Sequence, residues 1–207
     1  MMRLDEMQDL FEQFIPSQFK DFYYSGIVTP LTKRDSQGRL ILLGRLGRWK
    51  VDEYDFDQAL AASIVLFNYC AAKSIKTQHC GVVAVLDFRG WNLQQMLGIK
   101  IGRLKIAVKL MQDSCPAKIK GFHILHHPRL VKVLYFLLTP FLKKKLRSRI
   151  HFHSDESSLH ELIGPDIIPA TSEAVAQNSY FDEKMITDLL SEDKYNLDMV
   201  TFGYPSC

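Results

Sequence analysis

The sequence lacks any apolar stretch of the roughly 18–20 residues that a helix needs to cross a bilayer. Its first residues, MMRLDEMQDLFEQF, mix acidic side chains with hydrophobic ones and do not resemble the apolar core of a signal peptide. Internal repeats and low-complexity segments are also absent. With 207 residues, 47% of them hydrophobic and 24% charged, the chain fits one globular domain with short appendages.

Cysteine is scarce, and its positions form no recognisable pattern. The spacings match no zinc-binding or redox motif, so we expect reduced thiols in a cytoplasmic protein at Cys70, Cys80, Cys115 and Cys207. Two histidine pairs lack the Cys, Asp or Glu neighbours that would complete a tetrahedral metal site: His126 with His127, and His151 with His153. We therefore expect neither a metal nor a cofactor.

Signatures of common catalytic sites are missing as well. Gly44-x-x-Gly47 does not make a dinucleotide fingerprint, and no phosphate-binding loop occurs. Asp113 and Ser114 lack the strand–turn–helix context of a nucleophile elbow. One carboxylate, Asp87, ends a predicted strand, where some α/β enzymes place a catalytic group. The sequence therefore favours a binding protein over an enzyme.

Acidic residues are absent from one long stretch, 114–154, which nevertheless carries nine lysines and arginines. Since the whole chain has a net charge of +3, the remainder carries 3 − 9 = −6. Such segregation predicts a locally electropositive surface with an anionic partner. Charge alone leaves open whether that partner is a nucleic acid, an acidic protein or an anionic membrane.

Apolar spacing predicts strands that alternate with helices. Short apolar runs predict strands at 39–46, 81–88, 120–125 and 150–153. Helical spacing predicts helices within 5–24, 57–72, 92–113 and 130–149, the first broken by Pro16 and the last by Pro140. This alternation is typical of βαβ units, so we predict an α/β fold with a mainly parallel β-sheet flanked by helices.

Several short segments follow one another in a distinctive order. They are VLDFRGW at 85–91, QDSCP at 112–116, KIKGFHI at 118–124, PFLKKKLRSRIHFH at 140–153, and SLH at 158–160 followed by Ile168-Pro169. Each segment is weak evidence alone, but the similarity to which they belong extends from about Gly26 to Pro169. The series resembles the CRAL-TRIO (Sec14-like) lipid-binding family, in particular its tocopherol-transfer and retinaldehyde-binding branch.

This resemblance implies an apolar cavity between the sheet and its helices, covered by a gate helix at 130–142. It implies a lipid-binding domain at 26–170, a remnant of an N-terminal helical lobe at 1–25, and a variable C-terminal tail at 171–207. Relatives carry a longer N-terminal lobe and a Tyr-Gly-Gly element that is not found after Pro169. We therefore expect a truncated isoform or a partial sequence. The resemblance also implies a structural role for Asp87.

The resemblance also implies two groups of site residues. Phosphoinositide headgroups are expected to bind four basic residues, with an ordinary solvated surface as the alternative: Lys118, Lys120, Lys145 and Arg149. A hydrophobic ligand is expected to contact fifteen residues that could equally be ordinary core: Ala61, Ile64, Phe67, Asn68, Val82, Ala84, Leu86, Ala107, Leu110, Met111, Ile119, Leu130, Val133, Leu134 and Leu137. The amide of Asn68 stands out, because a buried amide needs a hydrogen-bond partner.

The implied function is transfer of a tocopherol-, retinoid- or phospholipid-like molecule between membranes by a cytoplasmic monomer that binds membranes peripherally. Phosphoinositide binding would then promote opening of the gate and release of the ligand. The alternative is an interaction or regulatory module of the same fold that carries no lipid. Nucleic-acid binding is the least supported, since the basic stretch contains no known nucleic-acid-binding motif.

Overall fold

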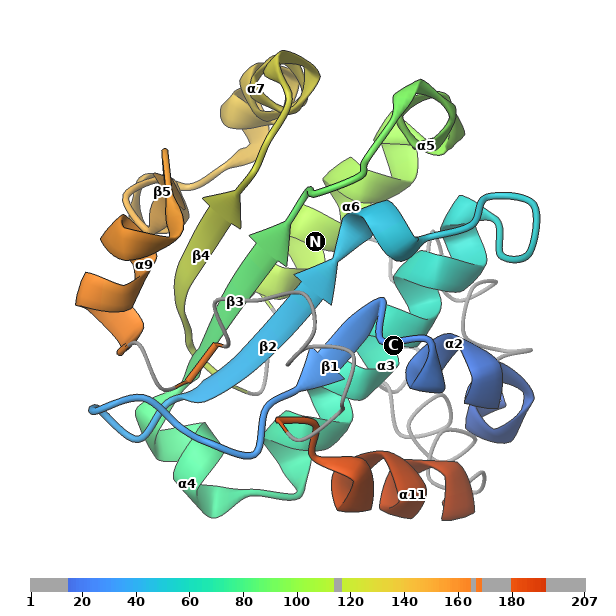
Figure 1. The fold of residues 1–207 in the computed structure, drawn as a ribbon, viewed down its shortest axis with the longest axis vertical. Coiled ribbons are helices and arrows are strands. Elements are labelled where there is room, and N and C mark those ends of the chain that lie inside the picture. Colours follow the sequence, from blue (N-terminus) through green and yellow to red (C-terminus); the bar gives the residue numbers. More distant parts are fainter. Residues whose placement is uncertain (1–14, 114–116, 165–166, 169–179, 193–207) are drawn as a thin grey trace, which may run out of the picture.

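A computed structural model describes residues 15–113, 117–164, 167–168 and 180–192 and contains one five-stranded sheet (Figure 1). The strands lie in chain order: β1 (Val28–Pro30), β2 (Leu40–Arg45), β3 (Val82–Asp87), β4 (Ile119–Leu125) and β5 (Ile150–Phe152). The pairs β2–β3, β3–β4 and β4–β5 are parallel, and only the edge strand β1 is antiparallel to its neighbour. The predicted mainly parallel α/β fold is confirmed.

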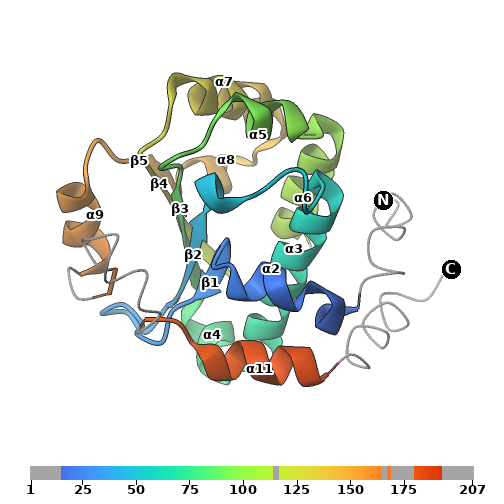
Figure 2. The same ribbon diagram turned by 45° about the vertical axis from the view of Figure 1, so that its right-hand side comes forward.

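Helices connect the strands and cover both sides of the sheet. The helical elements are η1 (Pro16–Phe19), α2 (Lys20–Tyr24), η2 (Leu46–Arg48), α3 (Phe56–Ala72), α4 (Ile75–Cys80), α5 (Leu93–Gly98), α6 (Ile101–Asp113), α7 (Arg129–Leu138), η3 (Thr139–Phe141), α8 (Lys144–Arg147), α9 (Glu156–Ile163) and α11 (Glu183–Ser191). Figure 2 shows α9 on one side of the sheet and α2, α3 and α6 on the other, with α5 and α7 together at the top.

The two faces of the sheet carry alternate residues of each strand. One face bears Val83 and Val85 and packs against Leu159 and Ile163 of α9, and we call it the outer face. The inner face bears the other residues of β3, beginning with Val82, and lies towards α3. Both faces are covered, as expected for a parallel sheet.

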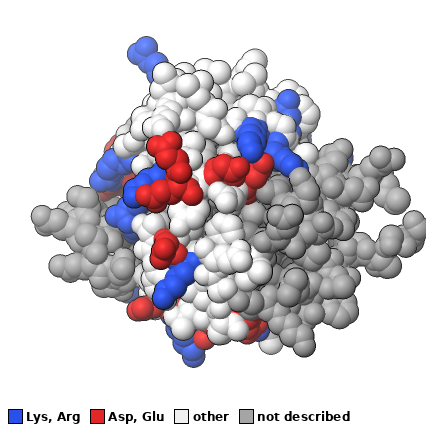
Figure 3. All heavy atoms as spheres, turned by 90° about the vertical axis from the view of Figure 1, so that its right-hand side faces the viewer, with Lys and Arg blue, Asp and Glu red and all other residues white. Residues whose placement is uncertain are grey.

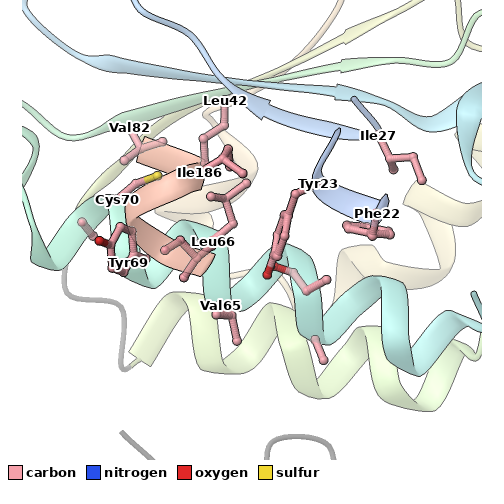
Figure 4. Packing of buried hydrophobic residues seen from close by; sticks show 14 of the residues in the cluster. Phe22, Tyr23, Ile27, Leu42, Val65, Leu66, Tyr69, Cys70, Val82 and Ile186 are labelled. Atoms are coloured by element: carbon pink, nitrogen blue, oxygen red, sulfur yellow. The ribbon is translucent and has the colours of Figure 1, made fainter. Parts of the chain in front are cut away.

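The longest helix, α3, begins at a capping box. Asp55 accepts a hydrogen bond from the backbone of Gln58, whose side chain bonds back to the Asp55 amide. Towards the sheet, α3 contributes Leu66 and Cys70 to the largest core cluster (Figure 4). The Tyr23 hydroxyl from α2 donates to the Ala62 carbonyl at 3.1 Å, which satisfies a polar group in this core.

One predicted helix is wrong in extent. Residues 92–113 form two helices, α5 and α6, instead of one. Asn92 caps α5, and Ile99 leaves the helical conformation with φ −70° and ψ 120°. Gly98 allows close packing at this break, because a Cβ there would lie 3.2 Å from the Trp49 ring and 3.1 Å from Val51. Tertiary contacts therefore override the continuous helical spacing.

The other predicted elements are confirmed within the described residues. The segment 130–149 is interrupted at Pro140 and forms α7, η3 and α8. The short elements β1 and α4 were not predicted. The predictions for residues 1–14, Cys115, Cys207 and Pro169 lie outside the described residues.

Part of the predicted C-terminal tail belongs to the core. Leu31, which directly follows β1, forms an antiparallel β-bridge with Phe181. The Asp182 amide donates to the Pro30 carbonyl at 3.0 Å. Ile186 and Leu189 of α11 are fully buried against α3. The division at residue 170 did not anticipate this packing.

In the described part of the chain, no helix combines the length and the apolar character that crossing a bilayer requires. The described cysteines, Cys70 and Cys80, are free thiols. Burial raises the pKa of the Cys70 thiol, which lies 3.0 Å from the Met185 sulfur. Cys70 therefore behaves as a core side chain.

Candidate functional site

The inner face of β3 is packed less completely than its outer face. Val83 and Val85 on the outer face are 0% exposed. Ala84 and Leu86 alternate with these valines along the strand and therefore lie on the inner face, and both remain partly exposed. Because β3 is flanked by strands on both sides and by helices on both faces, partial exposure here means that space is left next to the inner face.

Partly buried apolar side chains from several elements border this region. Tyr135 of α7 and Phe152 of β5 meet edge to face with ring centroids 5.2 Å apart. Further members, also incompletely buried, are Phe67, Met111, Phe122 and Ile150. The region therefore offers a largely apolar wall to which strands, α3, α6 and α7 all contribute.

The fifteen residues predicted to contact a ligand fall into three groups. Fully or almost fully buried are Ala61, Val82, Ala107, Ile119 and Leu134. Partly buried are Ile64, Phe67, Asn68, Ala84, Leu86, Leu110 and Met111. Exposed on α7 are Leu130, Val133 and Leu137. The partly buried group is the one that can contact both protein and a ligand, while the exposed group lies on the outside of α7 in this conformation.

Asn68 lies on α3 and is half-buried. A primary amide can both donate and accept, so Asn68 retains the capacity to orient a polar group of a ligand.

An apolar surface lies at the end of the molecule formed by α5 and α7 (Figures 1 and 2). Phe136 on α7 is 76% exposed and Leu97 on α5 is 77% exposed. The remaining members of this surface are Leu93, Leu130, Val133, Leu137 and Phe141. Figure 3 shows basic and acidic side chains intermixed across the middle of one side of the molecule, whereas its upper part is largely uncharged.

Sequence reasoning missed the contribution of α5 to this surface. Leu93 and Leu97 are four residues apart and so share one face of the helix. This spacing is visible in the sequence, but the prediction of one continuous helix over 92–113 did not separate the two leucines from it. Phe136 lies within the predicted gate helix at 130–142.

The four predicted phosphoinositide residues come from two neighbouring segments. The Arg149 guanidinium donates to the carbonyl of Ile119, the residue that separates Lys118 from Lys120 at the start of β4. The Lys120 side chain passes Gly81, where a Cβ would lie 2.7 Å from it. Lys145 is exposed on the preceding helix α8. The structure thus links Arg149 to the start of β4 and places Lys145 on the short helix that precedes β5.

Asp87 links the loops at the carboxyl edge of the sheet. Its carboxylate lies 2.9 Å from His126 Nδ1 and accepts from the Arg89 backbone amide at 2.9 Å. Arg89 also forms an ion pair with Glu156 at 2.6 Å. These bonds tie the β3 and β4 loops to the start of α9, so the interactions of Asp87 are structural.

Three histidine rings lie together on the outer face of β4 and β5. His123 Nδ1 is 2.8 Å from His153 Nε2, and His151 stacks on His123 with centroids 5.2 Å apart. The Ser158 hydroxyl donates to the Asp155 carbonyl and therefore accepts from His153 Nδ1 at 2.9 Å. His153 Nε2 is then the acceptor from His123 Nδ1, so the His153 ring is neutral.

This arrangement opposes protonation. Burial, followed by the neighbouring His153 and His151, lowers the pKa of His123 to about 4. Burial also lowers the pKa of His153. The sequence pointed to His151 and His153 but not to His123, because only strand pairing brings β4 beside β5. Among the described residues, no group of three or more potential metal ligands has a suitable arrangement.

Comparison with known proteins identifies relatives of this chain. It is 32% identical to mouse (Mus musculus) alpha-tocopherol transfer protein-like over 162 residues, which are 78% of this chain and 47% of that protein. It is also 32% identical to rat (Rattus norvegicus) clavesin-1 over 165 residues, 78% of this chain and 46% of that protein. The chain thus spans about half the length of these relatives.

Structural comparison agrees at the level of the fold. A crystal structure of Sfh5 superposes with a TM-score of 0.59 at 15% sequence identity, covering 87% of this chain and 74% of that one. The family model of the CRAL/TRIO domain matches residues 24–173, which make up well over half of the chain. The chain therefore belongs to the CRAL/TRIO domain family.

Proposed function

We propose that this chain binds one hydrophobic small molecule against the inner face of the sheet and transfers it between membranes. The observation that carries this proposal is the partial exposure of Ala84 and Leu86 on a central strand that is covered on both faces. A ligand that buries about 400 Å² of apolar surface gains about 10 kcal/mol before entropic costs. Tocopherol-, retinoid- and phospholipid-like molecules all offer such a surface.

The helix α7 acts as the gate in this proposal. Only Val131 and Leu134 of its ten residues are buried, so few contacts need to break when it moves. Its outer side carries apolar residues that would enter a membrane interface, next to the exposed lysines of α8. Basic residues near an anionic surface each contribute about 1 kcal/mol, and apolar insertion adds to this.

Phosphoinositide binding at the basic residues would promote this opening. Several cationic donors that converge on phosphate groups are the physical requirement, and in this proposal Lys118, Lys120 and Arg149 supply them. The hydrogen bond from Arg149 to the Ile119 carbonyl, between the two lysines in sequence, supports this assignment. Lys145 would join them from α8. In this proposal the protein is a cytoplasmic monomer that associates with membranes peripherally.

Native mass spectrometry of the purified 207-residue chain, followed by organic extraction, tests the carrier function. We expect a stoichiometric hydrophobic ligand, or uptake of one from vesicles that contain tocopherol, retinal or phosphatidylcholine. A chain that stays free of ligand under all these conditions would contradict the proposal. It would favour the alternative of an interaction module that keeps the fold but carries no lipid.

Charge reversal tests the phosphoinositide site. Lys118→Glu combined with Lys145→Glu should abolish binding to phosphatidylcholine vesicles that contain phosphatidylinositol bisphosphate, while ligand loading persists. Arg149 is left intact because its guanidinium bonds to the Ile119 carbonyl. Lys20→Glu combined with Lys184→Glu, on α2 and α11, makes the same change in net charge elsewhere. Equal loss of binding in both double variants would show a general charge effect and refute the assigned site.

A further inference from the structure

The junction between η3 and α8 contains two extended residues. Leu142 has φ −87° and ψ 120°, and Lys143, the N-cap of α8, has φ −61° and ψ 147°. An extended residue inside a helical region leaves the preceding carbonyl and the following amide without helical partners. Around Leu142 these groups are the Phe141 carbonyl and the Lys143 amide.

Gln112, near the C-terminal end of α6, pairs with both groups. Its Nε2 donates to the Phe141 carbonyl at 3.1 Å, and its Oε1 accepts from the Lys143 amide at 2.6 Å. In an extended chain these two backbone groups point to the same side, so one planar amide can bridge them. The side chain of Gln112 therefore takes the place of a neighbouring strand.

Two polar contacts and one buried apolar contact also link these segments. Lys143 Nζ forms an ion pair with Asp113, and both side chains are substantially exposed. Lys105 Nζ lies 4.5 Å from the Phe141 ring centroid. Below the junction, Leu142 and Leu146 are buried against Val108 of α6. The junction is thus fixed to α6, whereas α7 itself rests on two buried side chains.

We propose that Gln112 is a positioning residue that fixes the C-terminal attachment of α7 and sets how often this helix leaves the inner face. The effect on lipid release rests on the proposed function, since it requires that α7 covers the ligand. The effect on the movement of α7 does not. Without the amide, both backbone groups bond to water equally well in the closed and the open positions, so the closed position loses its advantage.

Hydrogen–deuterium exchange of backbone amides measures the movement directly. In Gln112→Leu we expect exchange in residues 129–143 to be about tenfold faster, with α3 and β3 unchanged, which corresponds to losing one or two hydrogen bonds. Gln112→Glu can accept from Lys143 but cannot donate to Phe141, so an intermediate rate is expected. Lys143→Met removes the exposed ion pair, keeps the backbone amide and serves as the matched control.

Three results would overturn the proposal. These are unchanged exchange at 129–143 in Gln112→Leu, exchange that rises equally in β3, and a Lys143→Met variant that exchanges as fast as Gln112→Leu. The second would show a general loss of stability, and the third would assign the attachment to the ion pair. All three results can be obtained from protein without lipid, so they decide the role of Gln112 even if the carrier function fails.

Lipid kinetics then test the consequence for release. With an NBD-labelled tocopherol as probe, Gln112→Leu should raise the association and dissociation rates by the same factor and leave Kd within about twofold. A gate that opens more often accelerates both directions equally. A faster dissociation rate without a matching rise in the association rate, and therefore a weaker Kd, would instead place Gln112 in the ligand contacts and contradict the positioning role.

Discussion

The two faces of this sheet use the same strands for different purposes. On the outer face, Val83 and Val85 pack with no exposure against Leu159 and Ile163 of α9. On the inner face, Ala84 and Leu86 of the same strand remain partly exposed. Close packing maximises stability, whereas incomplete packing leaves room for a ligand at the expense of stability. We therefore assign stability mainly to the outer face and binding to the inner face.

Truncating one leucine on each face should give the largest difference between the faces in the free energy of unfolding. Leu159→Ala on α9 should lower the free energy of unfolding by about 3 kcal/mol, because it leaves a cavity in a fully buried cluster. Leu86→Ala on the inner face should cost about 1 kcal/mol, since this side chain is already partly exposed. Urea denaturation of the ligand-free chain measures both. Equal losses would contradict the assigned division of roles.

Acid should weaken the outer face more than the inner one. His123 has its pKa lowered from 6.5 to about 4, so the folded form binds a proton less readily than the unfolded form. Its contribution is fully present above pH 6.5 and is lost as the pH falls towards 4. We expect a loss on the order of 2 kcal/mol from this residue across that window, measured by denaturation at a series of pH values.

Two histidine variants test whether His123 causes this pH dependence of stability. His123→Gln should flatten it, because the buried ring that resists protonation is gone. His79→Gln, an exposed position on α4, should leave it unchanged. The same acid-induced loss in wild type and in His123→Gln would show that other groups are responsible.

Much of this fold could be predicted from the sequence. The apolar runs gave β2 to β5, and alternation with helices gave the parallel sheet. The ordered motifs gave the family, which the match of the CRAL/TRIO domain over residues 24–173 confirms. These features depend on patterns that are local in the sequence, such as the continuous apolar run 81–88.

Features that depend on tertiary contacts could not be predicted. The break between α5 and α6 depends on Trp49 and Val51, more than forty residues away, packing at Gly98. Likewise, sequence spacing could not separate Val82, which is core, from Ala84, which is partly exposed on the same face. Spacing assigns a residue to a face of a strand, but the neighbouring helices determine how completely that face is filled.

Introducing one leucine on each face gives the smallest expected difference in stability between the two faces. It also separates the faces by function. Val83→Leu adds a methylene to a fully buried outer position and should cost about 1–2 kcal/mol without affecting lipid uptake. Ala84→Leu adds three carbons to the inner face, where space remains, so stability should change by less than about 1 kcal/mol. The added side chain would occupy volume that a ligand needs, and uptake of NBD-labelled tocopherol should fall. If Ala84→Leu binds the probe as well as wild type does, the ligand does not lie against β3, because a side chain and a lipid cannot occupy the same space.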